Sequence, residues 1–197
     1  MRFPLYLLPF AAGIVLPSFS LAAELTCSDP IQKGDSAESL TQRFGEDAVI
    51  VDLPGAEGET QQGVQLFPND PDKRLNVYFF DEAMQELATV QPDDGVTGWS
   101  VDGLSIGDDF QTLLEANGGP FEISGFDWDY GGYVTDFLDG KLSTLDGGCG
   151  LSVRFSPDPD TEVPMELSGD QVISSSNETL VTLNPKVGSI ALLWGEP

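Results

Sequence analysis

Residues 34–45 read GDSAESLTQRFG and residues 107–118 read GDDFQTLLEANG. In both segments the two glycines stand eleven positions apart, and an aspartate follows the first glycine. A hydroxyl residue followed by leucine occupies matching positions, and an apolar residue, Ile31 or Leu104, precedes each segment by three positions. Self-similarity of this kind predicts that one structural unit occurs twice in the chain.

Each segment predicts a short helix with polar caps. The residues at 35–36 and at 108–109 have side chains that can accept hydrogen bonds from the free N–H groups of a first helical turn. Acidic groups there also suit the positive end of the helix dipole. Gly45 and Gly118 stand where a left-handed residue ends a helix. Helices of two to three turns are marginal alone, so each must pack on a sheet.

Apolar runs separated by clusters of Gly, Pro, Asp and Asn follow each helix and predict strands. After the first helix the runs lie at 48–53, 64–67, 75–80 and 86–90. After the second they lie at 121–126, 133–137, 141–145 and 151–155, with Asp139-Gly140 as a two-residue hairpin turn. The tail predicts one or two helical turns within 176–183 and a final strand over 186–194.

These elements predict an α+β fold. We expect two tandem units, each a short helix plus an antiparallel sheet, with a C-terminal strand extension that completes the second sheet. The first helix-meander unit spans residues 24–95, and the second spans residues 96–197. A linker is expected between them over 91–98.

The order of glycine, polar cap, helical leucine and closing glycine, followed by a meander, resembles the SmpA/OmlA family of tandem units. Such units occur in a small outer-membrane assembly lipoprotein and, duplicated, in the beta-lactamase inhibitor protein. Residues 106–108 and 118–121 carry the closest fit, and the resemblance covers residues 31–155. It implies a protein-binding scaffold rather than an enzyme. The segment 125–132, GFDWDYGG, is also similar to uncharacterised exported bacterial proteins without an assigned activity.

Residues 1–23 predict a secretory signal peptide. Met1-Arg2 forms a short positive start, and the apolar run over 5–16 is too short to span a bilayer. Small residues at 18–23 allow cleavage after Ala22 or after Ala23. We therefore expect a periplasmic or secreted bacterial protein without stable membrane insertion after cleavage. An uncleaved N-terminal anchor is the alternative.

Cys27 and Cys149 are the two cysteines of the chain. In an oxidising compartment a lone pair most simply forms one disulfide. This bond would close a loop of roughly 120 residues and, on the chain-entropy account, contribute roughly 4–5 kcal/mol. The rival interpretation is a pair of reactive thiols, which typically show a Cys-x-x-Cys spacing or a neighbouring histidine. The sequence has neither feature.

The chain is strongly acidic, with 33 Asp and Glu against 8 Lys and Arg and a formal net charge of −25. This charge repels nucleic acid and anionic membrane surfaces. It favours general solvation of an exported protein, and it also suits a cationic or basic protein partner. The chain has no histidine, which removes Ser-His-Asp and Cys-His catalysis and the usual zinc ligand sets. We therefore expect no catalytic residues and no cofactor.

The segment Phe126-Asp127-Trp128-Asp129-Tyr130 alternates strictly between aromatic and acidic residues. On a strand the three aromatic side chains would share one face and the two aspartates the other. One interpretation is an aromatic face packed in the core. A second is an aromatic platform that binds a partner, because Trp and Tyr are favoured interface anchors. A third is a glycosidase with the two aspartates as acid and nucleophile.

Two acidic turns, at 69–72 and 156–162, carry clustered carboxylates that calcium can use. Neither matches the EF-hand spacing, so solvated loops are the simpler interpretation and the metal ligands stay unassigned. The function expected from the sequence is that of an exported, non-catalytic binding or assembly protein that acts by protein–protein contact in the bacterial envelope. The alternatives are a glycosidase-like enzyme using carboxylates alone and an acidic calcium-binding envelope protein.

Overall fold

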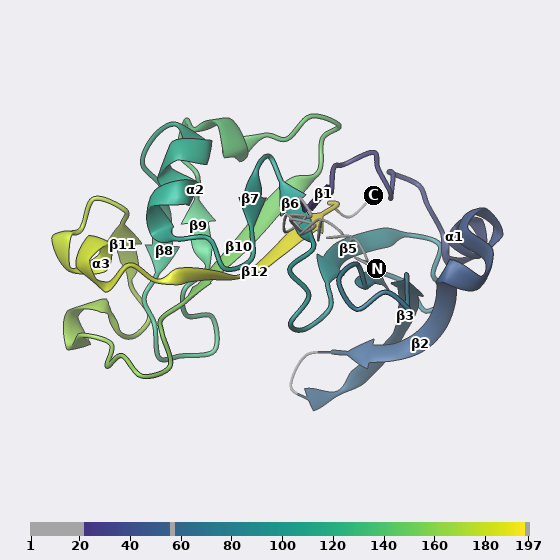
Figure 1. Ribbon diagram of the computed structural model, residues 1–197, viewed down its shortest axis with the longest axis horizontal. Helices are drawn as coiled ribbons and strands as arrows, with labels where there is room; N and C mark the ends of the chain where they lie inside the picture. Colours follow the sequence, from purple (N-terminus) through teal and green to yellow (C-terminus); the bar gives the residue numbers. More distant parts are fainter. Residues whose placement is uncertain (1–21, 56–57, 196–197) are drawn as a thin grey trace, which may run out of the picture.

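The computed structural model describes residues 22–55 and 58–195, so the predicted signal peptide lies almost entirely outside the described residues. Figure 1 shows two lobes, the first half of the chain on the right and most of the second half on the left. Within the described ranges, no helix is long and apolar enough to cross a membrane. The mixture of short helices and antiparallel sheets confirms the α+β class.

The first half forms a helix followed by four consecutive antiparallel strands, as predicted. In chain order the elements are α1 (Ala37–Phe44), the 3-10 turn η1 (Gly45–Asp47), β2 (Ala48–Pro54), β3 (Thr60–Leu66), β4 (Leu75–Phe79) and β5 (Leu87–Pro92). Helix α1 packs against β2 and β3, and Leu40 is fully buried there. Apolar residues alternate along β4, where Leu75 and Val77 face the core beside Leu66 and Val64 of β3.

The second half divides its strands among three sheets. Its elements are β6 (Trp99–Val101), β7 (Leu104–Ser105), α2 (Phe110–Asn117), β8 (Glu122–Ser124), β9 (Val134–Asp136), the 3-10 turn η3 (Lys141–Ser143), β10 (Gly150–Ser156), the 3-10 turn η4 (Met165–Leu167), β11 (Val172–Ser174), α3 (Glu178–Leu183) and β12 (Lys186–Leu193). A small sheet joins β1 (Ala23–Glu24) to β6 and β7. A second small sheet has the order β11-β8-β9.

The expectation that the C-terminal strand completes a separate second sheet is wrong. Strand β12 pairs with β10 on one side and with β5 on the other, so the large sheet has the order β10-β12-β5-β4-β3-β2. The physical reason is that Ile190, Leu192 and Trp194 are all buried, and Leu192 lies opposite Val90 of β5. These side chains belong to the core that both lobes share, which places β12 between the strands of the two halves.

The predicted strand over 141–145 is also wrong, because the chain forms the turn η3 there. The cause is Asn117, the last residue of α2, whose side chain is 1% exposed. Its amide group donates to the carbonyl of Phe137, and its carbonyl oxygen accepts from the N–H of Leu142. The N–H of Gly140 also donates to the carbonyl of Phe137 and the N–H of Ser143 to the carbonyl of Gly140, so the segment is held in successive turns. Asp139-Gly140 therefore leads into a turn rather than a hairpin.

The two helices have the same length and equivalent caps. Each has eight residues, and Ser36 or Asp109 accepts a hydrogen bond from the N–H three residues further on. Bonds from the backbone and side chain of Thr112 lower the pKa of Asp109. Gly118 is left-handed, as predicted, with φ of 70°. Gly45 also has positive φ, but its ψ of −121° leads the chain into η1 instead.

The residue before each cap makes the same local bond in both places. The carboxylates of Asp35 and Asp108 each accept from the N–H three residues earlier, at 2.9 Å and 2.7 Å. The apolar residues that precede them, Ile31 and Leu104, are both fully buried. Asp35 is itself buried, and Arg43 in the last turn of α1 pairs with it at 2.6 Å.

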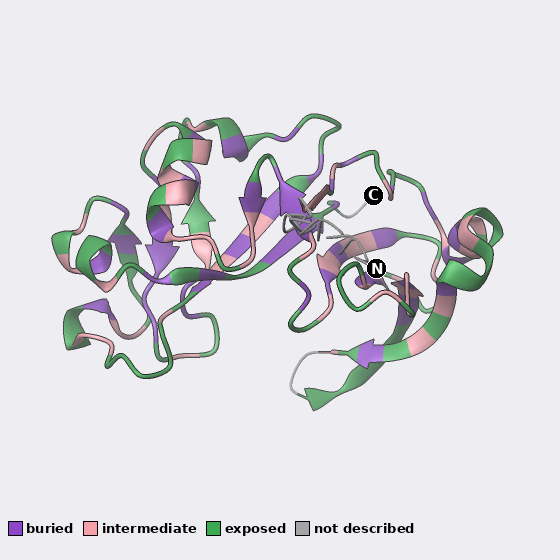
Figure 2. Ribbon diagram, viewed as in Figure 1, coloured by how far each residue is buried: buried purple, intermediate pink, exposed green. Residues whose placement is uncertain are grey.

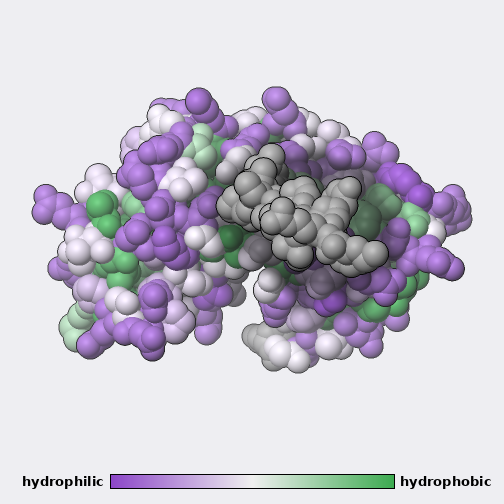
Figure 3. Space-filling model, in the orientation of Figure 1, coloured by the Kyte–Doolittle hydropathy of each residue, from purple (hydrophilic) through white to green (hydrophobic). Residues whose placement is uncertain are grey.

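One hydrophobic core runs through both lobes (Figure 2). The rings of Phe110, Phe121 and Phe155 pack together in the second lobe, with centroids 5.1 to 6.0 Å apart. Most side chains on the molecular face in Figure 3 are hydrophilic, and hydrophobic ones form small separate patches. A hydrophilic surface of this kind agrees with the large number of Asp and Glu residues in the chain.

The disulfide between Cys27 and Cys149 is confirmed, and both residues are buried. It joins the segment after β1 to the residue before β10, across 122 positions of the chain. Replacing both cysteines by alanine should therefore lower the free energy of unfolding by roughly 4–5 kcal/mol, since the unfolded chain gains loop entropy. Urea unfolding measures this loss. The wild type unfolded under reducing conditions should match the variant, and an unchanged midpoint would contradict the prediction.

A polar cluster at the edge of β3, β4 and β5 predicts a pH effect. Gln65 donates to Asn76, and Asn76 and Arg74 donate to Asp93 at 2.9 Å and 3.0 Å. Burial alone would raise the pKa of Asp93, but these bonds from Asn76 and Arg74 lower it below its ordinary value.

Asp93→Asn should thus reduce the free energy of unfolding by about 1 kcal/mol near pH 7. The pKa is lower in the folded chain than in the unfolded chain, where it is about 3.9. The contribution of the carboxylate is therefore present above about pH 4 and is lost as the pH falls through the folded value. Urea unfolding at pH 7 and near pH 3 should show the difference shrinking. The exposed neighbour provides the control, Asp94→Asn, which should show a smaller effect at both pH values.

Candidate functional site

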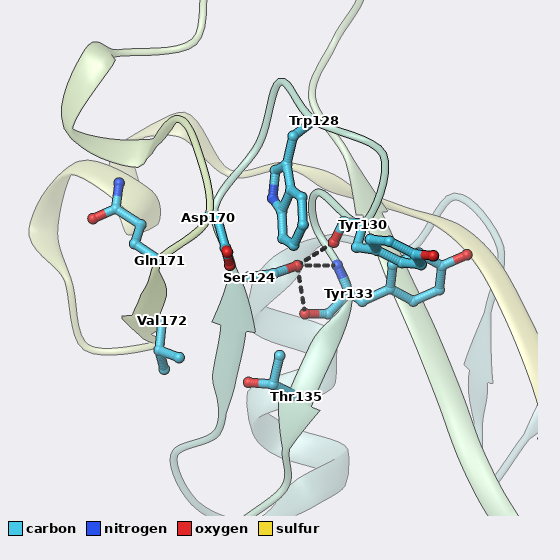
Figure 4. Close-up of a pocket in the computed structure, with 8 residues that line it drawn as sticks. All are labelled: Ser124, Trp128, Tyr130, Tyr133, Thr135, Asp170, Gln171 and Val172. Carbon is cyan, nitrogen blue, oxygen red and sulfur yellow. Dashed lines mark hydrogen bonds between the residues drawn. The ribbon is translucent and has the colours of Figure 1, made fainter.

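A groove of about 390 Å³ lies on the solvent side of the β11-β8-β9 sheet (Figure 4). The opposite side of this sheet faces the core through Ile123 and Ile173, which are buried. The lining is mainly apolar and comes from three strands and two loops. Its residues are Ser124, Trp128, Tyr130, Tyr133, Thr135, Asp170, Gln171 and Val172.

The alternating segment 126–130 forms a loop rather than a strand, so the three aromatic side chains do not share one face. Phe126 makes a single bridge to Ser168, and the chain then turns at Asp127, whose φ is 63°. Positive φ at a non-glycine residue breaks the extended geometry on which alternation depends. Phe126 points into the core with 3% of its surface exposed, whereas Tyr130 is 67% exposed. Trp128 is intermediate.

Close backbone contacts hold this loop against the C-terminal segment. The N–H of Phe126 donates to the carbonyl of Leu167, and the N–H of Gly169 donates back to the carbonyl of Phe126. A Cβ atom at Gly125 would collide with the carbonyl oxygens of Gly169 and Leu167. Glycine at 125 is therefore required for the two segments to meet and for the groove to form between them.

Hydrogen bonds within the loop hold the Trp128 indole and the main chain of Tyr130. The indole N–H of Trp128 donates to the carbonyl of Gly125 at 2.8 Å, and the ring meets Tyr130 edge-to-face with centroids 5.4 Å apart. The buried hydroxyl of Ser124 donates to the carbonyl of Tyr130 and accepts from the N–H of Tyr133 at 3.1 Å. Ser124 thus ties the main chain of the loop at Tyr130 and Tyr133, and the Trp128 indole is held by its own bond to Gly125.

The carboxylate that lines the groove is that of Asp170, not that of Asp127 or Asp129. Figure 4 shows Asp170 on one side of the Trp128 indole and the two tyrosines on the other. Asp127 and Asp129 are both exposed, and Asp127 accepts a bond from the Ser168 hydroxyl at 2.7 Å. Asp127 and Asp129, two of the predicted binding residues, therefore do not line the groove, whereas Trp128 and Tyr130 do.

The side chain of Arg154 already contacts one of the aromatic rings that line the groove, that of Tyr133. The guanidinium of Arg154 lies 5.1 Å from the centre of the Tyr133 ring, and its Nε donates to the carbonyl of Gly131 at 2.8 Å. The ring of Tyr133 thus already has a cationic neighbour. Trp128 and Tyr130 provide the remaining aromatic surface.

The acidic turns do not assemble a ligand set. Across residues 22–55 and 58–195, no three His, Cys, Asp or Glu side chains come close enough to hold a metal ion. Within the turns, Asp70 accepts from the N–H of Asp72 and Asp158 accepts from the N–H of Asp160. Local bonds of this type are typical of solvated turns.

The sequence did not indicate six of the lining residues: Ser124, Tyr133, Thr135, Asp170, Gln171 and Val172. Gly131-Gly132 next to the alternating run is a turn signal that could have identified the loop. Nothing local marks Asp170 or Val172, because a distant pairing brings them to the groove.

Comparison with known proteins adds no relative, because no family model, curated protein or solved structure matches the chain. The SmpA/OmlA resemblance stays a hypothesis, and the site is interpreted from its geometry.

The loop geometry predicts that Gly132→Ala is more destabilising than Gly95→Ala. Both glycines have similar positive φ, 80° and 77°, so both substitutions carry the strain of a left-handed alanine, about 1 kcal/mol. A Cβ at 132 would also collide with the carbonyl of Phe155 and approach the Phe126 ring to 3.0 Å, whereas position 95 is open. We expect a total loss of roughly 3 kcal/mol at 132. Equal losses in urea unfolding would disprove the close packing of this loop.

Proposed function

We propose that this protein is an exported, non-catalytic binding protein that acts by contact with another protein, and that the aromatic groove is its contact site. The observation that carries the proposal is the positioned pair Trp128 and Tyr130. Tyrosine and tryptophan with exposed surface give much binding energy at interfaces, because each buries a large apolar area and retains a polar tip. The Trp128 ring, already held by its bond to Gly125, loses little conformational entropy on binding.

The proposal includes tandem units of the SmpA/OmlA kind. Helices α1 and α2 have equal lengths and equivalent caps, and this supports a duplicated origin. The resemblance implies a protein-binding scaffold, and the aromatic groove would be the binding feature of the second unit.

Export is supported by the buried disulfide, because such bonds persist mainly in oxidising compartments outside the cytoplasm. We propose that residues 1–23 direct the chain there and that it works in the periplasm or beyond it. The acidic surface keeps such a protein dispersed.

A binding role is preferred over a glycosidase because both candidate carboxylates are in water. A general acid needs a raised pKa, which burial usually provides. Asp127 and Asp129 are both exposed, so burial does not supply this condition at either residue.

Photo-cross-linking within the cells that produce the protein tests the proposal. A photoreactive phenylalanine analogue at Val172, which is 64% exposed in the groove, should capture a discrete partner. The same analogue at Ile50, which is 50% exposed on β2 in the other lobe, is the matched control and should not. Capture at 50 but not at 172 would place the contact elsewhere and overturn the proposal.

Alanine substitutions test the role of the aromatic rings. Tyr130→Ala should weaken partner capture by roughly tenfold or more while the melting temperature stays within a few degrees, since this ring is mostly exposed. Phe80→Ala, an exposed aromatic outside the groove, is the control and should retain capture. If Phe80→Ala lost capture and Tyr130→Ala retained it, the contact site would instead lie on the large sheet.

A further inference from the structure

We propose that the groove receives a basic side chain, arginine or lysine, carried by an extended peptide segment of the partner. The inference rests on the proposed function and makes it more specific. Three features that border one cavity support it: the Trp128 indole, the Asp170 carboxylate and the open edge of β11.

The segments that build the groove carry charge of one sign. Residues 120–140 contain five acids and residues 156–185 contain six, and neither range contains a lysine or an arginine. The basic residue placed against the aromatic cluster is Arg154, which comes from β10 and is engaged with Tyr133 and Gly131. A cation from outside would thus enter a negative field with no competing positive charge in either segment.

The short-range contacts favour a cation as well. Indole is the aromatic group that attracts cations most strongly through its face. Trp128 lines the cavity with Asp170 beside it, so a guanidinium or ammonium group there could contact a ring and a carboxylate together. Val172 and Thr135 also line the groove, below Trp128 in Figure 4, and the aliphatic stem of lysine or arginine can pack there. Arg154 over Tyr133 shows the same type of contact within the molecule.

The edge of β11 favours a peptide over a small organic cation. Strand β11 pairs with β8, and just beyond the two strands the N–H of Gly125 donates to the carbonyl of Gln171 and the N–H of Ser175 donates to the carbonyl of Phe121. In an antiparallel pair alternate residues direct their main-chain groups to opposite sides, so the N–H and C=O of Val172 face away from β8. An extended segment that pairs there adds a strand to the sheet and aligns its side chains with the groove.

Titration with two peptides of defined sequence tests the inference. The probe is acetyl-Thr-Val-Arg-Val-Thr-amide, and its matched control has citrulline, a neutral isostere, in place of arginine. The readout is the ¹H–¹⁵N spectrum of the indole groups. The protein has three tryptophans, and Trp99 and Trp194 are buried, so the Trp128 resonance reports on the groove. We expect the arginine peptide to shift this resonance and to bind about fivefold to tenfold more tightly than the citrulline peptide.

Two substitutions and one modified peptide separate the contributions. Asp170→Asn should reduce the preference for arginine by about fivefold, whereas Asp160→Asn, an exposed acid of the same segment outside the groove, should leave it unchanged. Trp128→Leu should abolish the preference, and Trp128→Phe should retain part of it. Methylating the main-chain nitrogens at alternate peptide residues should weaken binding if the peptide pairs with β11.

The outcomes distinguish this inference from the function on which it rests. If both peptides bind equally, or if the arginine peptide leaves the Trp128 resonance unmoved at millimolar concentration, the cationic preference is overturned while capture at position 172 can still stand. Tetramethylammonium that binds as well as the peptide, with no effect of N-methylation, would overturn the peptide and indicate a small-cation site. Failure to capture a partner at position 172 would contradict the proposed function itself.

Discussion

The structure depends on the ladder between β10 and β12. Residues 150–156 and 186–193 pair along their full length, and β12 continues the sheet into the first lobe through Leu192 and Leu193. The segment 157–185 is therefore anchored at both ends by the paired residues Ser156 and Lys186. This segment includes β11 and forms one wall of the groove. Because both of its ends are fixed, a long stretch with little regular structure can still position Asp170 and Val172.

The groove is an assembly of two segments, and its shape follows from close backbone approach. The loop after β8 and the segment after η4 exchange main-chain bonds at Phe126, which also anchors its ring in the core. Without a side chain, Gly125 lets the two backbones meet. Trp128 and Tyr130 are then left on the solvent side, supported by Ser124 from below. Core packing and exposure of the aromatic rings are therefore coupled, since one loop provides both.

The sequence predicted the features that local chemistry determines and missed those that distant contacts determine. Both helices and the strands from 48 to 90 follow from caps and apolar runs. The strand expected at 141–145 failed because a buried amide at Asn117 bonds that segment from outside it. Alternation at 126–130 favours a strand with one aromatic face, but the positive φ of Asp127 breaks it. Ser168 contacts Asp127 across 41 positions, and no local pattern signals such a pairing.

The acidity of the chain and the apolar lining of the groove have complementary physical roles. The field of a chain with formal charge −25 extends over the surface and speeds the approach of a basic partner, but salt screens it within about 10 Å. It therefore cannot select one basic sequence over another. Selection needs direct contacts, which are much shorter than this screening distance. In our proposal Trp128 and Asp170 provide them, so discrimination between arginine and a neutral isostere should persist at salt concentrations that remove the long-range attraction.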